Sequence, residues 1–245
     1  MNKQLTPLAE PYRRLWSKEE YYRLGECGFF QGQKVELVDG DIIVPYPDPE
    51  KSGLPYRTGS PQSRLWTKAE YYRLGELGFF RGQKVELLEG TIVVASPQNW
   101  SHYSGLDRVA EVLRNALGAG VWVRTQAPLN LGLMTEPEPD VSVVAGRRAD
   151  YRDHPTTALL IVEVSDTTLD YDRTTKASIY ASAGIADYWV VNLVQDQVEI
   201  FRNPVADPSQ PYGHRYADMT VHFSGMSINP LANPTVMIAV KDLLG

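Results

Sequence analysis

Residues 159–191, LLIVEVSDTTLDYDRTTKASIYASAGIADYWVV, decide the fold class of this chain. The stretch opens as an apolar strand that contains Glu163, continues as a helix that carries Lys176, and ends in a second apolar strand. A carboxylate near the end of a buried strand is energetically costly unless another group pairs with it. Glu163 is therefore a candidate for a functional role.

A second carboxylate, Asp140, opens the apolar run in EPEPDVSVV (residues 136–144). Side chains alternate between the faces of a strand, which predicts that Asp140 points with Ser142 and Glu163 with Ser165. If the two strands are neighbours, both carboxylates can reach one Mg²⁺, with backbone carbonyls and water completing its shell.

Asp140 and Lys176 also have simpler interpretations, whereas no residue nearby in the sequence pairs with Glu163. Asp140 follows a proline, as turn residues often do. Lys176 could pair with Asp172, four residues earlier, on the surface of a helix. Spacing alone leaves both interpretations open.

The N-terminal part of the chain contains a duplication. Residues 14–44 recur at residues 64–94 with about three quarters of the positions identical. Each copy predicts a short helix that begins after Ser17 or Thr67, followed by a hairpin around an Asp-Gly or Glu-Gly turn. Two copies are too few for a solenoid, so a local duplication of one module is the simpler explanation.

The segment after the first copy, PYPDPEKSGLPYRTGSPQ, is rich in proline and glycine and predicts a linker. The second copy instead runs directly into the rest of the chain. We therefore predict an added arm and linker over residues 1–63 and a complete domain over residues 64–245. The arm could pack beside its twin, cover a sheet edge or mediate self-association.

Further elements follow along residues 64–245. Apolar periodicity predicts a helix over 105–117 and another over 171–183, and strands over 121–129, 141–144, 158–165, 186–193 and 197–202, with a final helical turn at 240–244. Strands and helices mix without strict alternation. The pattern predicts an α+β or α/β fold with a central mixed sheet flanked by helices.

Composition narrows the class of protein. The chain has 245 residues, is 43% hydrophobic and 22% charged, and has no apolar run long enough to span a membrane. Its start lacks the apolar core of a secretion signal, and Cys27 is the single cysteine, which favours a cytoplasmic protein. The net charge of −6 argues against strong non-specific binding to nucleic acid, although a local basic groove is compatible with it.

These residues resemble the Uma-type family of putative restriction endonucleases, a branch of the PD-(D/E)XK nuclease superfamily. The resemblance covers nearly all of residues 64–245 and rests on ordered motifs: VELLEGTIV, His102, PEPDVSVV, the stretch 159–191 and the proline-rich tail. It implies a restriction-endonuclease-like fold with a duplicated N-terminal helix–hairpin module. It also implies a Mg²⁺- or Mn²⁺-dependent endonuclease that hydrolyses phosphodiester bonds in DNA.

The resemblance also assigns roles to residues. Asp140 and Glu163 would ligate the metal, with Glu86 a further ligand or a water-mediated contact, and Lys176 would assist the attacking water. The superfamily places its lysine two residues after the glutamate, where this chain has Ser165, so the lysine comes from the following helix. Glu36 matches Glu86 in the first copy, and we favour Glu86 because its copy is contiguous with the domain.

His102 stays outside the predicted catalytic set, as a residue at a helix N-terminus. The nuclease is expected to be a homodimer, which suits cleavage of both strands, although no residue specifies the interface. The alternative is a non-catalytic protein that keeps the nuclease scaffold as a binding or regulatory module. A third possibility is hydrolysis of another phosphate ester at the same metal site.

Overall fold

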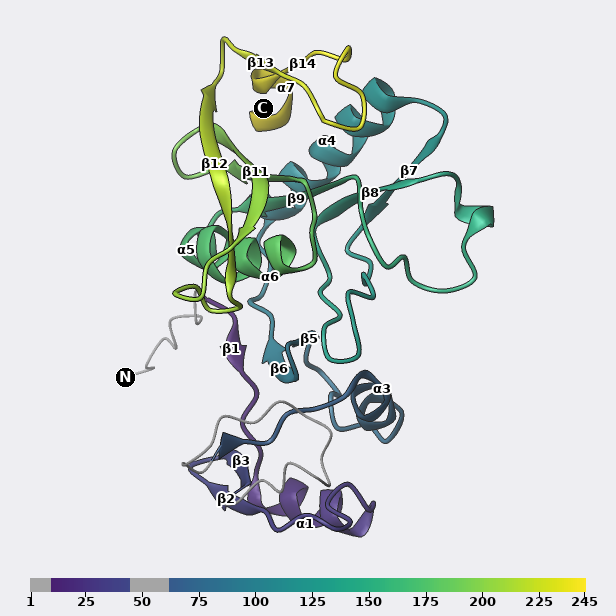
Figure 1. Cartoon of the computed structure of the whole chain (residues 1–245), viewed down its shortest axis with the longest axis vertical. Coiled ribbons are helices and arrows are strands. Elements are labelled where there is room, and N and C mark those ends of the chain that lie inside the picture. Colours follow the sequence, from purple (N-terminus) through teal and green to yellow (C-terminus); the bar gives the residue numbers. More distant parts are fainter. Residues whose placement is uncertain (1–9, 45–61) are drawn as a thin grey trace. The chain divides into compact units, whose positions relative to one another are not determined.

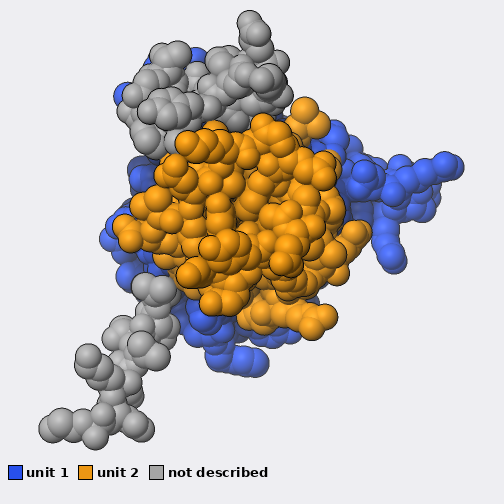
Figure 2. Space-filling model, turned by 90° about the horizontal axis from the view of Figure 1, so that it is seen from below, with its two compact units in different colours: residues 1–11, 95–132, 136–245 blue, residues 12–94, 133–135 orange. Residues whose placement is uncertain are grey.

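The structure is a computed structural model that describes residues 10–44 and 62–245 (Figure 1). Two compact units, coloured separately in Figure 2, divide the chain. In the described part, unit 2 contains residues 12–44, 62–94 and 133–135, and unit 1 contains the remainder. Apart from Gln62, the predicted linker lies outside the described residues. None of the helices described is long and apolar enough to cross a membrane.

Unit 2 holds both copies of the repeat, and each copy forms a helix followed by a hairpin. The capping boxes predicted at Ser17 and Thr67 are present, with the side chain of Glu20 or Glu70 returning to the backbone of the cap. The elements are β1 (Tyr12–Arg13), α1 (Lys18–Glu26), β2 (Glu36–Val38), β3 (Asp41–Val44), β4 (Gln62–Ser63), α3 (Lys68–Glu76), β5 (Val85–Leu88) and β6 (Thr91–Val94).

The two copies exchange strands. The short strand β1, which precedes the first copy, pairs with β6 of the second copy. In the same way β4, which precedes the second copy, pairs with β3 of the first. Each module therefore completes the three-stranded sheet of the other.

Side chains repeat this exchange. Arg14 of the first copy donates to the Phe79 carbonyl of the second at 2.8 Å, and Arg64 donates to the Phe29 carbonyl of the first at 2.9 Å. The rings of Trp16 and Trp66 lie 5.1 Å apart within one shared apolar core.

This shared core bears on the predicted division of the chain. A boundary between residues 63 and 64 separates the two copies, whereas the compact units place both copies together. Residues 12–44 share an apolar core with the second copy, and their strand β1 also pairs along the edge strand β6. The physical reason is that the aromatic side chains of each copy pack against those of the other: Trp16 contacts Phe79, and Trp66 contacts Phe29.

Unit 1 is built on a six-stranded mixed sheet with the order β12-β11-β10-β9-β8-β7. Only β9 and β10 run parallel; the other neighbours are antiparallel. The elements are α4 (Trp100–Leu117), β7 (Val121–Thr125), β8 (Val141–Ala145), a 3₁₀ turn (Arg148–Asp150), β9 (Leu160–Ser165), α5 (Leu169–Tyr171), a π-helical turn (Asp172–Lys176), α6 (Ala177–Ser182), β10 (Asp187–Asn192), β11 (Gln197–Ala206), β12 (His214–Phe223), β13 (Ser227–Ile228), β14 (Ile238–Ala239) and α7 (Val240–Leu244).

Helices cover both faces of this sheet. On one face, Val141, Val162 and Trp189 join the apolar core formed with α4 and α7. On the other face α6 brings Tyr180 against Tyr188, whose rings lie 5.1 Å apart. The predicted central mixed sheet flanked by helices is confirmed (Figure 1).

Element boundaries differ from the prediction at several places: β7 ends at Thr125, β11 extends to Ala206, and α4 and β12 show the largest differences. Helix α4 begins five residues before the predicted start, because the side chain of Asn99 accepts a hydrogen bond from the His102 N–H and caps it. Strand β12 was not predicted as a long strand, since its sequence is mostly polar and its residues are mostly exposed.

Candidate active site

Asp140 and Glu163 face one another across two neighbouring strands. Strands β8 and β9 are antiparallel, with Val141 opposite Val162, so Asp140 comes opposite Glu163. The Asp140 N–H donates to Glu163 Oε2 at 2.9 Å, and the Val164 N–H donates to Asp140 Oδ2 at 2.9 Å. These reciprocal bonds hold the two carboxylates in a fixed relation, and both side chains are buried.

Lys176 reaches this pair from the helical connection between β9 and β10. Its Nζ lies 3.6 Å from Glu163 Oε1, and only 5% of the residue is exposed. The Tyr180 hydroxyl donates to the same oxygen at 2.7 Å. The structure thus brings Asp140, Glu163 and Lys176 together.

A π-helical turn presents Lys176. Within it, the Ala177 N–H donates to the Asp172 carbonyl five residues back, which is the π-helical pattern. Both Asp172 and Lys176 are buried in this turn. Such wide turns are frequent at functional sites, and this one lies directly beside the acid pair.

Asp172 is a third buried carboxylate, which the sequence analysis considers only as a surface partner for Lys176. Its Oδ2 accepts hydrogen bonds from the hydroxyls of Ser165 and Thr168, each at 2.6 Å. Ser165 occupies the position where the superfamily pattern has lysine. Here its hydroxyl supports Asp172, the first residue of the turn that carries Lys176.

Burial and mutual repulsion shift the pKa values of the carboxylates in this cluster. Burial, together with the charges of Asp140 and Asp172, raises the pKa of Glu163 to about 8, although Lys176 and Tyr180 oppose the shift. Burial likewise raises the pKa of Asp172 to about 6 against the hydrogen bonds of Ser165 and Thr168. Burial opposes ionisation of Asp140 as well, but His102, the Val164 N–H and Lys176 hold its pKa below the usual range.

His102 is a site residue that the sequence analysis leaves out. Its Nε2 lies 3.0 Å from Asp140 Oδ1. Asn99, which caps α4, also donates to Asp166 Oδ2 at 2.7 Å, just beyond β9. The signal in the sequence was present: a capped helix start with a histidine three residues on, ahead of the two acidic strands.

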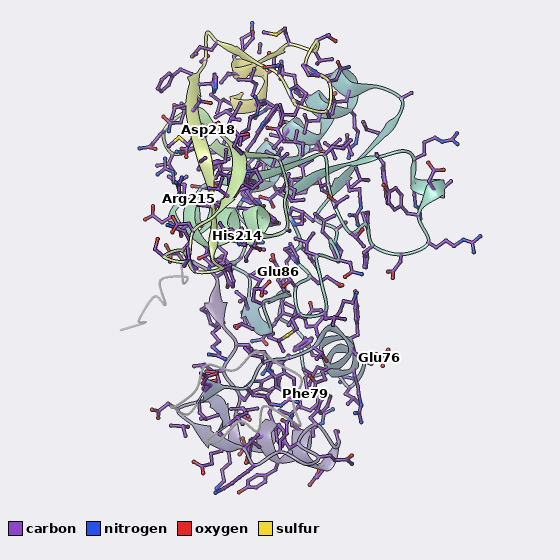
Figure 3. All side chains as sticks on the ribbon, viewed as in Figure 1. Glu76, Phe79, Glu86, His214, Arg215 and Asp218 are labelled. Atoms are coloured by element: carbon purple, nitrogen blue, oxygen red, sulfur yellow. The ribbon has the colours of Figure 1, made fainter. Side chains whose placement is uncertain are left out.

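Glu86 and its duplicate Glu36 occur in corresponding strands of unit 2, β5 and β2. Glu86 is buried, with 8% of the residue exposed, whereas Glu36 is exposed. The second copy also has contacts that the first lacks, since the Lys68 and Gly90 N–H groups donate to the carbonyls of Leu133 and Met134. Glu86 is labelled on unit 2 in Figure 3, and its part in the site remains a prediction.

The donor set of the acid pair suits a magnesium ion. Carboxylate oxygens are hard ligands, and Mg²⁺ commonly uses one or two of them together with water and substrate phosphate. Three buried carboxylates lie near one lysine and one histidine, so the cluster carries an excess of negative charge when all three carboxylates are ionised. Among residues 10–44 and 62–245, no group of three or more His, Cys, Asp and Glu side chains is arranged to hold a metal. The candidate set is therefore Asp140 and Glu163 alone within unit 1.

Comparison with known proteins identifies the family. The model of the Uma2 family, described as "Putative restriction endonuclease", matches residues 69–228. The chain belongs to the Uma2 family. No protein of curated function matches it.

A solved structure supports the same fold. The crystal structure of a "putative nuclease belonging to DUF820" from Anabaena variabilis aligns with a TM-score of 0.51 over 66% of this chain and 90% of that one, at 15% sequence identity. At this identity the likeness concerns the fold, and it agrees with the mixed sheet of a nuclease-like protein. The Uma2 match includes Glu86, Asp140, Glu163 and Lys176 within its bounds.

Proposed function

We propose that this Uma2 protein is a Mg²⁺-dependent endonuclease that hydrolyses phosphodiester bonds in DNA. The observation that carries the proposal is the acid pair: Asp140 and Glu163 are locked together by reciprocal backbone bonds, with Lys176 Nζ 3.6 Å from Glu163. Membership of a family described as restriction endonucleases supports the same reaction class. Mn²⁺ would serve in place of Mg²⁺, and the enzyme would act as a homodimer in the cytoplasm.

The residues of the site would have different roles in this reaction. Asp140 and Glu163 would hold the cation, which when bound would lower the pKa of a water and neutralise charge on the phosphate. Lys176 would hold the attacking water and stabilise the negative charge that develops on the phosphate oxygens. His102 fixes the orientation of the Asp140 carboxylate, and Tyr180 that of Glu163.

A bound cation would also offset the repulsion between the carboxylates of the cluster. The raised pKa of Glu163 means that burial and the neighbouring carboxylates disfavour its ionised form, even with Lys176 and Tyr180 beside it. Asp140 and Glu163 would both be ionised when they hold a divalent cation, so the pKa of Glu163 would fall. Metal affinity should therefore rise with pH as Glu163 releases its proton.

Plasmid cleavage with Mg²⁺ or Mn²⁺ tests the proposal. Glu163→Gln and Asp140→Asn each keep the shape of the side chain, and we expect each to lower the cleavage rate roughly a hundredfold or more. Titration calorimetry with Mn²⁺ should show one binding event in the wild-type protein and none in either variant. Asp218→Asn, on the edge strand β12 (Figure 3), is the control that should leave both measurements unchanged.

Another result would favour the alternative function. If the wild-type protein neither binds Mn²⁺ nor cleaves DNA while its fold is intact, the acid pair is structural and the protein is a scaffold-type binding module. Cleavage that persists in Glu163→Gln would also contradict the proposal.

A further inference from the structure

Three side chains beside the acid pair carry buried polar atoms that have no hydrogen-bond partner in the described part of the chain. They are Nε and Nη1 of Arg124, Nε2 of Gln126 and Oγ of Ser142. Arg124 is 5% exposed and Ser142 is 1% exposed. Buried polar groups in proteins are nearly always paired, so three neighbouring exceptions need an explanation.

The strand register places Arg124 and Ser142 on the face of the sheet that carries the acids, and the backbone of Gln126 continues from β7 beside Asp140. Arg124 pairs with Ser142 across β7 and β8, and Ser142 pairs with Ile161 across β8 and β9. The Gln126 N–H donates to the Asp140 carbonyl at 3.0 Å, so Gln126 stands opposite Asp140. Asp140 thus has Glu163 on one side and Gln126 on the other.

Spacing in a sheet brings the arginine close to the acid pair. Arg124 is the diagonal neighbour of Asp140, at a backbone separation of about 7 Å in an antiparallel sheet. Strand β7 is the edge of the sheet, so the row of acids ends in these donors. Gln126 has a φ of 44°, a left-handed conformation that is uncommon for this residue and frequent at functional sites.

Structural contacts account for only part of Arg124. Its Nη2 donates to the Pro128 carbonyl at 2.9 Å, and the guanidinium carbon lies 5.0 Å from the centre of the Trp122 ring. Among the described residues, no carboxylate forms an ion pair with Arg124, whereas Arg173 pairs with Glu199 and Arg202 with Asp187. A buried guanidinium with two unpaired donor nitrogens can bind an anion.

We propose that Arg124, Gln126 and Ser142 form a phosphate subsite that receives a backbone phosphate of the nucleic acid next to the acid pair. The planar guanidinium would donate from Nε and Nη1 to two phosphate oxygens, and the amide and hydroxyl would add single donors. The inference rests on the proposed nuclease function for the source of the phosphate. The subsite would position the substrate, while the cluster around Asp140 carries out the chemistry.

Inorganic phosphate is the first probe, because it does not depend on cleavage. An anion that binds the folded state raises the melting temperature. Thermal unfolding is compared in phosphate and in chloride at matched ionic strength for the wild type, Arg124→Gln, Arg124→Lys and Arg215→Gln. We expect phosphate to stabilise the wild type and Arg215→Gln, to stabilise Arg124→Lys less, and to leave Arg124→Gln unchanged.

Arg215 is a matched control because it lies on β12, the opposite edge strand of the same sheet, and pairs with Asp207 (Figure 3). The lysine variant keeps the charge but loses the planar fork, so partial recovery distinguishes anion binding from packing. A fully folded Arg124→Gln protein that phosphate stabilises as much as the wild type would overturn the subsite.

The second probe is a DNA duplex, bound to the cleavage-deficient Glu163→Gln protein and followed by fluorescence anisotropy at several salt concentrations. Adding Arg124→Gln should weaken binding roughly tenfold and lower the salt slope by about one unit, as expected for one lost phosphate contact. Unchanged affinity and slope would contradict the inference while leaving the nuclease proposal intact. A different outcome is that the wild-type protein does not cleave DNA, while phosphate stabilises the wild type but not Arg124→Gln. This outcome would support the subsite and refute the nuclease proposal.

Discussion

Three arginines of this chain are equally buried but differ in their partners. Arg14, Arg64 and Arg124 are each 5% exposed. In unit 2, Arg14 contacts Glu20, a backbone carbonyl of the other copy and Gln83, and Arg64 repeats this set with Glu70 and Gln33. Arg124, in unit 1, has one carbonyl for three nitrogens among the residues described. Complete pairing indicates a structural charge, and incomplete pairing indicates a charge kept for a ligand.

The acidic side chains of the two units differ in the same way as the arginines. Around Glu163, burial and like charges raise the pKa to about 8, so the site holds its carboxylates at a cost. In unit 2 the carboxylates of Glu20 and Glu70 each meet an arginine at 2.5 Å and also cap a helix. Unit 2 therefore pairs its charges in a way that stabilises the fold, whereas the acids of unit 1 reduce stability at the place where we propose the chemistry.

The largest effect is expected from replacing the arginines. Arg14→Met and Arg64→Met should each lower the free energy of unfolding by about 2 kcal/mol, because a buried carbonyl and a carboxylate lose their donor. Arg124→Met should change it by less than about 0.5 kcal/mol, since the unpaired donors leave with the side chain. Urea denaturation of the three variants and the wild type measures these changes in the free energy of unfolding. Equal losses at all three positions would show that Arg124 is structural.

The next effect concerns pH and Glu163. Because its pKa is raised from 4.5 to about 8, the folded protein keeps a proton that the unfolded chain has released in this range. Stability should therefore fall as pH rises from about 4.5 to 8, and Glu163→Gln should lose most of this decline, by roughly 1–2 kcal/mol near pH 8. Asp172, with a pKa of about 6, adds a decline in the same direction at lower pH.

Urea midpoints measured across this pH range for the wild type, Glu163→Gln and Asp218→Asn test the prediction. Asp218→Asn should keep the wild-type slope, because Asp218 is exposed on β12. A slope that is identical in all three proteins would mean that Glu163 ionises normally in the folded state.

The smallest effect compares the two copies directly. Glu86→Gln should lower DNA cleavage about tenfold if Glu86 supports the metal site through water, as an outer contact does. Glu36→Gln should change the rate less than twofold, since Glu36 is exposed and its copy is not contiguous with residues 95–245. Initial cleavage rates at saturating Mg²⁺ give both values. Equal losses, or a greater loss for Glu36→Gln, would reverse the preference for the second copy.

Much of this arrangement follows from the sequence. An acid inside an apolar strand is conspicuous, and Glu163 was found in this way. The same signal is present at Arg124 in VWVRT and was overlooked, because an arginine at a strand end is commonly solvated. Asp172 was misplaced because a helix-surface spacing and a π-helical turn have the same sequence pattern, and only the turn buries the side chain.

The exchange of strands between the copies lies beyond sequence reasoning. Nearly identical segments give identical local signals whether β1 pairs within its own copy or with β6 of the other. The choice depends on the joint packing of Trp16 and Trp66, which is a property of the assembled core. Strand β12 was missed for a related reason, since its pairing with β11 along ten residues leaves few apolar positions to detect.

That exchange has a consequence during protein synthesis. Tyr12 and Arg13 leave the ribosome early, but their strand partners, Val93 and Val94, are made about eighty residues later. The first module must wait, with its aromatic side chains uncovered, until the second has been translated. A pause in translation between the two modules would thus expose the nascent chain to aggregation or to pairing with a neighbouring copy.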